Sequence, residues 1–82
     1  MTDPTQVSDA TRATITRMAE RAWDMARAEL FYTIDGQAER ARHYRTAASL
    51  YALIGNEYRA KRSAERAATW QSYADAAARM AS

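Results

Sequence analysis

Small and apolar residues recur every three or four positions through the first third of the chain, which is the period of one face of an α-helix. Asp3 can cap such a helix, and Pro4 suits its first position because a proline lacks the backbone N–H that would stay unbonded there. The pattern predicts a helix over about residues 4–33, with a start at Ser8 or Asp9 as the alternative. The residues at this spacing are Val7, Thr11, Ile15, Met18, Ala22, Met25, Ala26 and Glu29.

A second helical segment, predicted over about residues 37–54, carries apolar residues on two sides. Asp35-Gly36 predicts the break before it, because glycine tolerates the conformation that ends a helix and Asp35 can cap the next one. Leu50 and Leu53 point nearly opposite to the other apolar residues, so this helix would lie between two neighbours. The alternative is an exposed leucine patch that binds a partner. The other face carries Ala41, Tyr44, Ala48, Tyr51 and Ala52.

A third helix is predicted over about residues 57–80. Gly55 would end the second helix, and Asn56 would cap the third. No segment alternates with the period of a strand, and the loops are short, so the chain predicts a single all-α domain over residues 1–82. We expect an antiparallel three-helix bundle with close, alanine-rich packing and with residues 1–3 disordered. The alanines expected to line the third helix are Ala60, Ala64, Ala67, Ala74, Ala78 and Ala81.

The last two segments also carry small and aromatic residues at a recurrent spacing, at Ala47, Leu50, Tyr51, Ile54, Gly55, Asn56, Ala60, Ala64 and Ala67. With this spacing, residues 37–80 resemble a tetratricopeptide-type helical hairpin. With the first helix included, the chain resembles the microtubule-interacting-and-trafficking module, a three-helix bundle whose second helix has a pattern similar to Tyr44, Ala47, Leu50 and Tyr51. Both families bind peptides or short helices in grooves and neither is an enzyme, so the resemblance implies groove binding.

Alanine dominates the apolar composition and limits the size of the core. The chain has 82 residues, 48% of them apolar, and 20 are alanine, which leaves about 19 bulky side chains. A domain of this size buries only about 60% of its unfolded surface, so we expect it to associate with another molecule. Since no apolar run reaches the ~20 residues that cross a bilayer and cysteine is absent, we expect a cytoplasmic protein without membrane contact.

Few residues are suited to catalysis or metal binding. The chain has no cysteine and one histidine, His43, which lies one helical turn after Glu39. Two ligands do not complete a metal site, so we interpret this pair as a surface pair on the second helix. We expect no catalytic residue, no metal and no cofactor, and therefore not an enzyme.

The third helix carries an unusual combination of arginines and aromatic rings. Residues at steps of three or four place Arg59, Arg62, Arg66, Trp70 and Tyr73 on one side of it. Unpaired guanidinium groups beside aromatic rings suit binding to a polyanion or an acidic protein surface. The alternative is that the two rings belong to the edge of the core, with Arg66 stacked on Trp70. Trp23 raises the same question on the first helix, where it is either a flap over the open side of the bundle or an anchor for a partner.

The sequence therefore predicts a small binding protein, most simply an adaptor, a regulatory subunit or an inhibitor of the anti-CRISPR kind from a phage or mobile element, with another protein as its partner. A second hypothesis is nucleic-acid binding through the same arginines, assisted by Arg42 and Arg45, since residues 36–82 carry eight basic residues against four acids. A third is a homodimer formed through Leu50 and Leu53.

Overall fold

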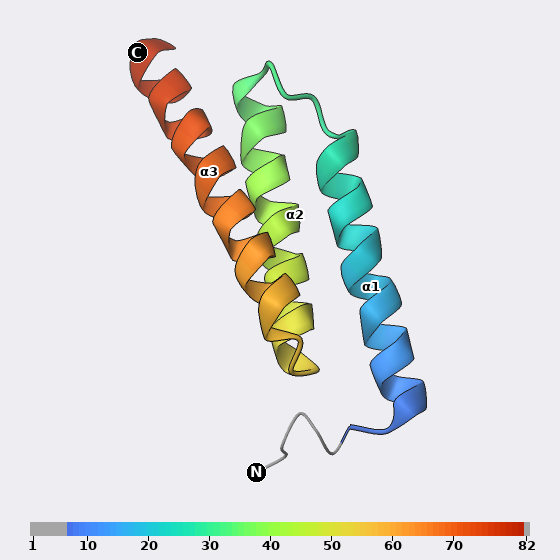
Figure 1. Cartoon of the computed structure of the whole chain (residues 1–82). Coiled ribbons are helices and arrows are strands. Elements are labelled where there is room, and N and C mark those ends of the chain that lie inside the picture. The colour runs from blue at the N-terminus through green and yellow to red at the C-terminus, as the bar shows by residue number, and fades with distance from the viewer. Residues whose placement is uncertain (1–6, 82) are drawn as a thin grey trace.

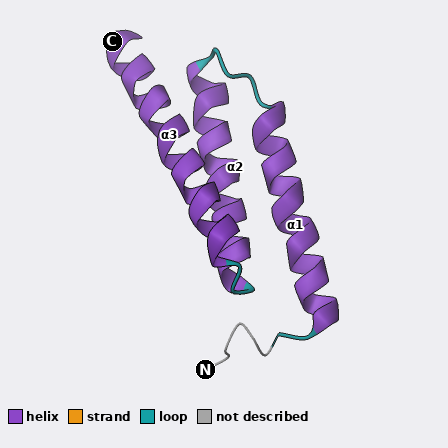
Figure 2. Ribbon diagram, viewed as in Figure 1, coloured by secondary structure: helices purple, strands orange, loops and turns teal. Residues whose placement is uncertain are grey.

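The computed structural model describes residues 7–81, which form three helices and no strand. The helices are α1 (Asp9–Ala28), α2 (Ile34–Leu53) and α3 (Glu57–Ala81). Each helix runs antiparallel to the next one along the chain (Figure 1), and short loops connect them (Figure 2). The predicted all-α three-helix bundle is confirmed. The predicted cap Asp3 and the predicted disorder of residues 1–3 lie outside the described residues.

The central helix is α2, which packs against both α1 and α3. This arrangement confirms the interpretation of its two-sided apolar pattern. A side-chain hydrogen bond links the outer helices, in which Trp23 Nε1 of α1 donates to Ser63 Oγ of α3 at 2.6 Å. The bundle is elongated, with extents of 48 × 22 × 18 Å. Among the three helices described, none combines the length and the hydrophobicity that a membrane crossing requires.

The ends of α1 differ from the main prediction. Ser8 has an extended backbone and its side chain accepts a hydrogen bond from Thr11 N at 3.2 Å, so the helix begins at the alternative start, Asp9. The helix ends at Ala28, five residues before the predicted end at 33. A contact that helical periodicity does not reveal lies at this end, where Arg40 of α2 donates through Nε and Nη2 to Glu29 O at 3.0 and 2.7 Å. These bonds satisfy a carbonyl that the ending helix leaves free.

Gly36 lies inside the first turn of α2, so the prediction that it breaks the chain between two helices is wrong. The N-cap is Thr33, whose hydroxyl accepts a hydrogen bond from Gly36 N at 3.0 Å. A glycine is required for a different reason, because a Cβ at this position would lie 2.0 Å from the carbonyl oxygen of Leu30. The residue therefore allows the loop after α1 to pack directly against the start of α2.

The turn between α2 and α3 follows the prediction closely. Gly55 has a φ of 75°, which favours glycine, and its N–H donates to Ala52 O at 3.0 Å. Asn56 N donates to Tyr51 O at 2.9 Å, which completes the hydrogen-bond pattern of a Schellman cap. The Asn56 side chain then accepts from Arg59 N at 3.1 Å and caps α3, whose observed end differs from the predicted one by a single residue.

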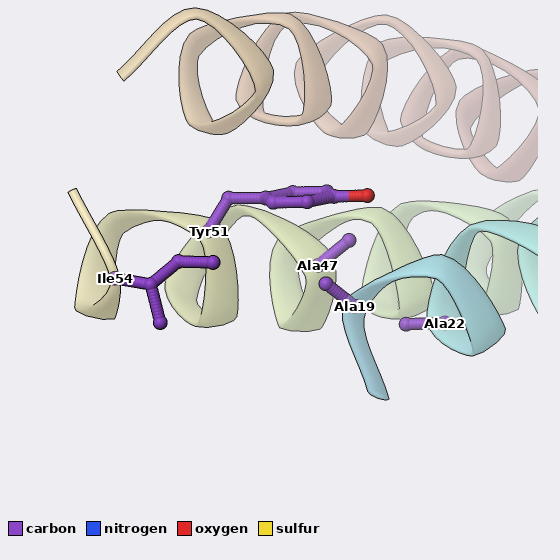
Figure 3. Packing of buried hydrophobic residues seen from close by; sticks show 5 residues of the cluster. All are labelled: Ala19, Ala22, Ala47, Tyr51 and Ile54. Carbon is purple, nitrogen blue, oxygen red and sulfur yellow. The ribbon is translucent and has the colours of Figure 1, made fainter. Parts of the chain in front are cut away.

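Two small clusters of buried residues form the core. The first combines Ala19 and Ala22 of α1 with Ala47, Tyr51 and Ile54 of α2, and Figure 3 shows the Tyr51 ring lying between α2 and α3. The second contains Ala26, Tyr44 and Ala67. Trp23 packs against both clusters. The alanines leave room for the few large rings, so the core is thin, as the composition indicates.

Several predicted inner positions are exposed. On α1, Met18 and Met25 face outward and Ala19 is buried instead, because α1 buries only a narrow alanine stripe against α2. On α3 the hydrogen bond from Trp23 turns Ser63 inward, and the buried residues of this helix are Ser63, Ala67 and Ala74. The residues predicted to be inside but found exposed also include Thr11, Ala52, Ala64, Ala78 and Ala81.

Candidate functional site

A hollow of about 350 Å³ lies between α1 and α3, over the centre of the bundle. We call it the α1/α3 groove. It is lined by Glu20, Trp23, Asp24 and Arg27 from α1, by Tyr51 from α2, and by Tyr58, Arg59 and Arg62 from α3. Two of these residues, Arg59 and Arg62, belong to the set predicted for partner binding, and the groove adds an acidic wall that was not predicted.

Trp23 is held rigidly at this groove. Its Nε1 donates to Ser63 Oγ at 2.6 Å, and Ser63 Oγ donates in turn to the backbone oxygen of Arg59 at 2.7 Å. The indole ring meets the ring of Tyr44 edge to face, with centroids 4.9 Å apart and an interplanar angle of 84°. Trp23 thus covers the side of the bundle between α1 and α3, and the part of it that stays accessible lines the groove.

Two of the predicted arginines lie over aromatic rings of the bundle itself. The guanidinium of Arg66 is 4.9 Å from the Trp23 ring centroid and 5.9 Å from that of Tyr44. That of Arg59 is 5.7 Å from the Tyr51 ring centroid. The expected stacking of Arg66 on Trp70 is wrong, because Arg40 of α2 occupies that position at 4.6 Å. Cation–π contacts of this kind hold the charged ends of the arginines close to the surface of the bundle.

The two walls of the groove differ in charge, because the α1 side carries two carboxylates and one arginine, Arg27, whereas the charged residues of the α3 side are arginines alone. Glu20 and Asp24 lie on the α1 side, one turn apart, and Arg59 and Arg62 lie on the α3 side. Within residues 7–81 no ion pair joins these walls, and the ion pairs that do form involve other side chains. Arg62 also borders a second hollow of about 230 Å³, with Glu65, Arg66 and Thr69. The groove therefore offers unneutralised carboxylates and guanidinium groups on either side of an aromatic floor.

The predicted stripe on α3 is divided into two parts. Trp70 and Tyr73 lie farther along the helix and contact each other edge to face, with centroids 5.4 Å apart. Trp70 packs against the second core cluster beneath Arg40, whose guanidinium also lies 5.8 Å from the Phe31 ring centroid. Tyr73 is 53% exposed. These two rings thus belong to an aromatic patch near the loop after α1, and neither lines the α1/α3 groove.

The secondary candidates are mostly engaged in contacts within the chain. Arg42 binds Glu39 through Nε at 3.0 Å and Nη2 at 2.5 Å, and these hydrogen bonds lower the pKa of the Glu39 carboxyl and raise the pKa of Arg42. Arg45 donates to Gln71 Oε1 at 3.1 Å, which links α2 to α3. Leu50 packs against the first core cluster, while Leu53 is 56% exposed. The expected leucine patch is therefore reduced to one residue.

His43 does not belong to a surface pair, so that interpretation is wrong. Its side chain is only 8% exposed, and its Nε2 faces two carboxylates, Glu29 Oε1 at 3.6 Å and Glu39 Oε2 at 3.8 Å. Glu29 joins the pair because α1 ends just before it and turns it toward α2. The early end of α1 was not predicted, so the third member of this cluster was missed.

Sequence reasoning also missed Glu20, Asp24 and Tyr58 of the groove. Glu20 and Asp24 are one helical turn apart and flank Trp23, which is a signal that the sequence carries. Tyr58 is 72% exposed at the start of α3, and nothing in the apolar pattern distinguishes it from a core residue.

Compared with known proteins, the chain matches no family model, no curated protein and no solved structure. The resemblance to tetratricopeptide hairpins and to the microtubule-interacting-and-trafficking module therefore stays a prediction from the residue pattern. Its implication for function has to be argued from the groove itself.

Proposed function

We propose that this protein is a non-enzymatic binding module that captures a segment of a partner protein in the α1/α3 groove. The observation that carries the proposal is that Glu20 and Asp24, which make no ion pair within residues 7–81, lie across Trp23 and Tyr51 from two arginines of α3. Aromatic side chains and arginine are enriched at the energetic centres of protein interfaces. Complementary charges around such a centre give a partner its orientation.

The groove dimensions and charges define the segment that fits. From Glu20 to Arg27 the α1 wall spans eight residues, or about 10 Å of helix, which two turns of a partner helix would cover. Such a segment would place an apolar side chain over Trp23 and Tyr58. It would direct acidic side chains toward Arg59 and Arg62 and basic ones toward Glu20 and Asp24. Helix-in-groove binding of this kind is also what the resemblance to groove-binding helical families implies.

A nucleic acid fits this groove less well than a protein does. The lining contains three arginines but also two carboxylates, Glu20 and Asp24, which would repel phosphates. Arg59 lies over Tyr51, which limits its reach toward a phosphate backbone. A polyanion would therefore meet little net positive charge, whereas a partner with both signs of charge satisfies both walls.

Photo-crosslinking in the source cell tests this proposal. A photoreactive phenylalanine analogue replaces Tyr58, which is 72% exposed at the groove, and the adducts are analysed by mass. We expect a protein adduct that disappears with Arg62→Glu and with Asp24→Arg. It should persist with Lys61→Glu, a matched charge reversal on α3 outside the groove lining.

Three other outcomes would contradict the proposal. A nuclease-sensitive adduct would favour the nucleic-acid hypothesis, and its affinity should then fall steeply with salt. An adduct of twice the mass of the chain would favour the homodimer. An adduct that tolerates both groove substitutions would place the binding surface elsewhere, for example at Tyr73 and Trp70.

A further inference from the structure

Three side chains that can bind a metal meet where α1 ends against α2. Glu29 follows the last residue of α1, and Glu39 and His43 are one turn apart on α2. One ligand atom from each side chain lies within 4.8 Å of the others. The backbone of Glu29 is fixed by Arg40, which donates two hydrogen bonds to its carbonyl oxygen. The cluster is thus held by the same contacts that end α1.

The distances within the cluster are too long for hydrogen bonds. His43 Nε2 is 3.6 Å from Glu29 Oε1 and 3.8 Å from Glu39 Oε2, whereas an N–H···O bond spans about 2.7–3.2 Å. The imidazole is more than nine-tenths buried, and the polar side chains that its Nε2 faces within residues 7–81 are these two carboxylates. Ligands around a tetrahedral zinc ion, with bonds of about 2.0–2.1 Å, are separated by roughly 3.4 Å. The two separations from His43 Nε2 are close to that value, and the two carboxylate oxygens lie within 4.8 Å of each other.

The charges of the cluster also favour a bound cation. Two carboxylates within 4.8 Å of each other repel unless a cation lies between them. Arg42 donates to Glu39 Oε2, the same oxygen that faces His43, so it orients this carboxylate and offsets part of its charge. In metal sites a ligating side chain is commonly oriented by such a hydrogen bond from a residue that does not itself bind the metal.

We propose that Glu29, Glu39 and His43 bind one divalent transition-metal ion, of which Zn²⁺ is the best fit. An imidazole nitrogen together with two carboxylate oxygens favours Zn²⁺ over Mg²⁺ or Ca²⁺, which prefer oxygen ligands alone. Three protein ligands leave a fourth position for water, and the partly exposed carboxylates leave the site open to solvent. The ion would fasten the end of α1 to α2.

Calorimetric titration of the full chain with Zn²⁺, with Co²⁺ as a spectroscopic substitute, tests the proposal. We expect one ion per chain and the visible absorption bands of four-coordinate Co²⁺. Glu29→Gln and His43→Gln should each weaken binding by more than about tenfold, the smaller end of the loss caused by removing even an outer partner. Glu65→Gln, an exposed glutamate on α3 outside the cluster, should bind like the unchanged chain.

Because His43 is buried and its replacement could unfold the chain, a second readout uses the unchanged protein. In ¹⁵N NMR of the imidazole, Zn²⁺ should shift Nε2 strongly and Nδ1 little, since Nε2 is the atom that faces both carboxylates. Unchanged chemical shifts of both imidazole nitrogens on addition of Zn²⁺ would overturn the proposal. Equal Zn²⁺ affinity in a folded Glu29→Gln variant would overturn it as well.

Discussion

The α2–α3 hairpin and the junction of α1 with α2 are built by different kinds of interaction. The hairpin turns through a glycine with positive φ and an asparagine cap, and both signals are local in the sequence. The α1 junction depends on distant contacts, namely Arg40 on the last carbonyls of α1 and Gly36 against Leu30. Both proposed sites involve α1: the groove opens between α1 and α3, and the metal cluster lies at the end of α1.

The largest effect on this comparison should come from Trp23→Ala, because Trp23 is the one side chain that packs against both described core clusters. Truncating it removes the edge-to-face contact with Tyr44 and the hydrogen bond to buried Ser63. We expect the free energy of unfolding to fall by about 3 kcal/mol, the lower end of the range for a large aromatic residue, because Trp23 is only partly buried.

Hydrogen exchange would show where this stability is lost. Amides of α1 should lose most of their protection in Trp23→Ala, whereas those of α2 and α3 should keep more of theirs. Trp23→Phe is the control, since it keeps a ring in place and loses the hydrogen bond together with a smaller part of the packing, at about 1–2 kcal/mol. Uniform loss of protection over all three helices would contradict the distinction between hairpin and junction.

The two glycines test the same difference between junction and hairpin, with smaller expected losses of stability than Trp23→Ala. Alanine is normally favoured over glycine in a helix by about 0.5–1 kcal/mol. In Gly36→Ala, however, the new Cβ would lie 2.0 Å from a backbone oxygen, so the loop must move, and we expect a net loss of about 2 kcal/mol. In Gly55→Ala the unfavourable φ of 75° should cost about 1 kcal/mol.

Urea unfolding followed by circular dichroism measures both glycine variants. The test is which variant loses more free energy of unfolding, since helix propensity alone would make Gly36→Ala the more stable of the two. A Gly36→Ala protein as stable as the unchanged chain would show that the loop after α1 yields easily.

These differences explain which features were predictable. The turn at Gly55 and Asn56 was predicted within one residue, because backbone conformation and capping act between neighbours in the sequence. The end of α1 was not, because the helical pattern continues past Ala28 and only the folded chain brings Arg40 to that end. The arginines of the groove and the carboxylate pair around Trp23 both carried a sequence signal. That they line one groove, and that His43 is buried, depended on how the helices are rotated against one another.

Controls aside, Arg40→Ala should lower the free energy of unfolding least. It tests the junction of α1 with α2 most specifically. Arg40 donates to the carbonyl oxygens of Arg27 and Glu29, and its guanidinium lies over Trp70. Because the side chain is only partly buried, water replaces part of what is lost, and we expect about 1 kcal/mol of destabilisation. Arg45→Ala, which removes a single exposed bond to Gln71, should change stability by less than about 0.5 kcal/mol.

In Arg40→Ala, the residues that lose exchange protection are more informative than the size of the loss in stability. If Arg40 ends α1, its removal should lower exchange protection around residues 26–30 and leave the turn at Gly55 unchanged. It should also loosen Glu29 and therefore weaken Zn²⁺ binding, whereas Arg45→Ala should leave that binding intact. Protection lost equally at both ends of α2 would mean that Arg40 stabilises the bundle as a whole. The end of α1 would then have to be set by the close contact between Gly36 and Leu30 alone.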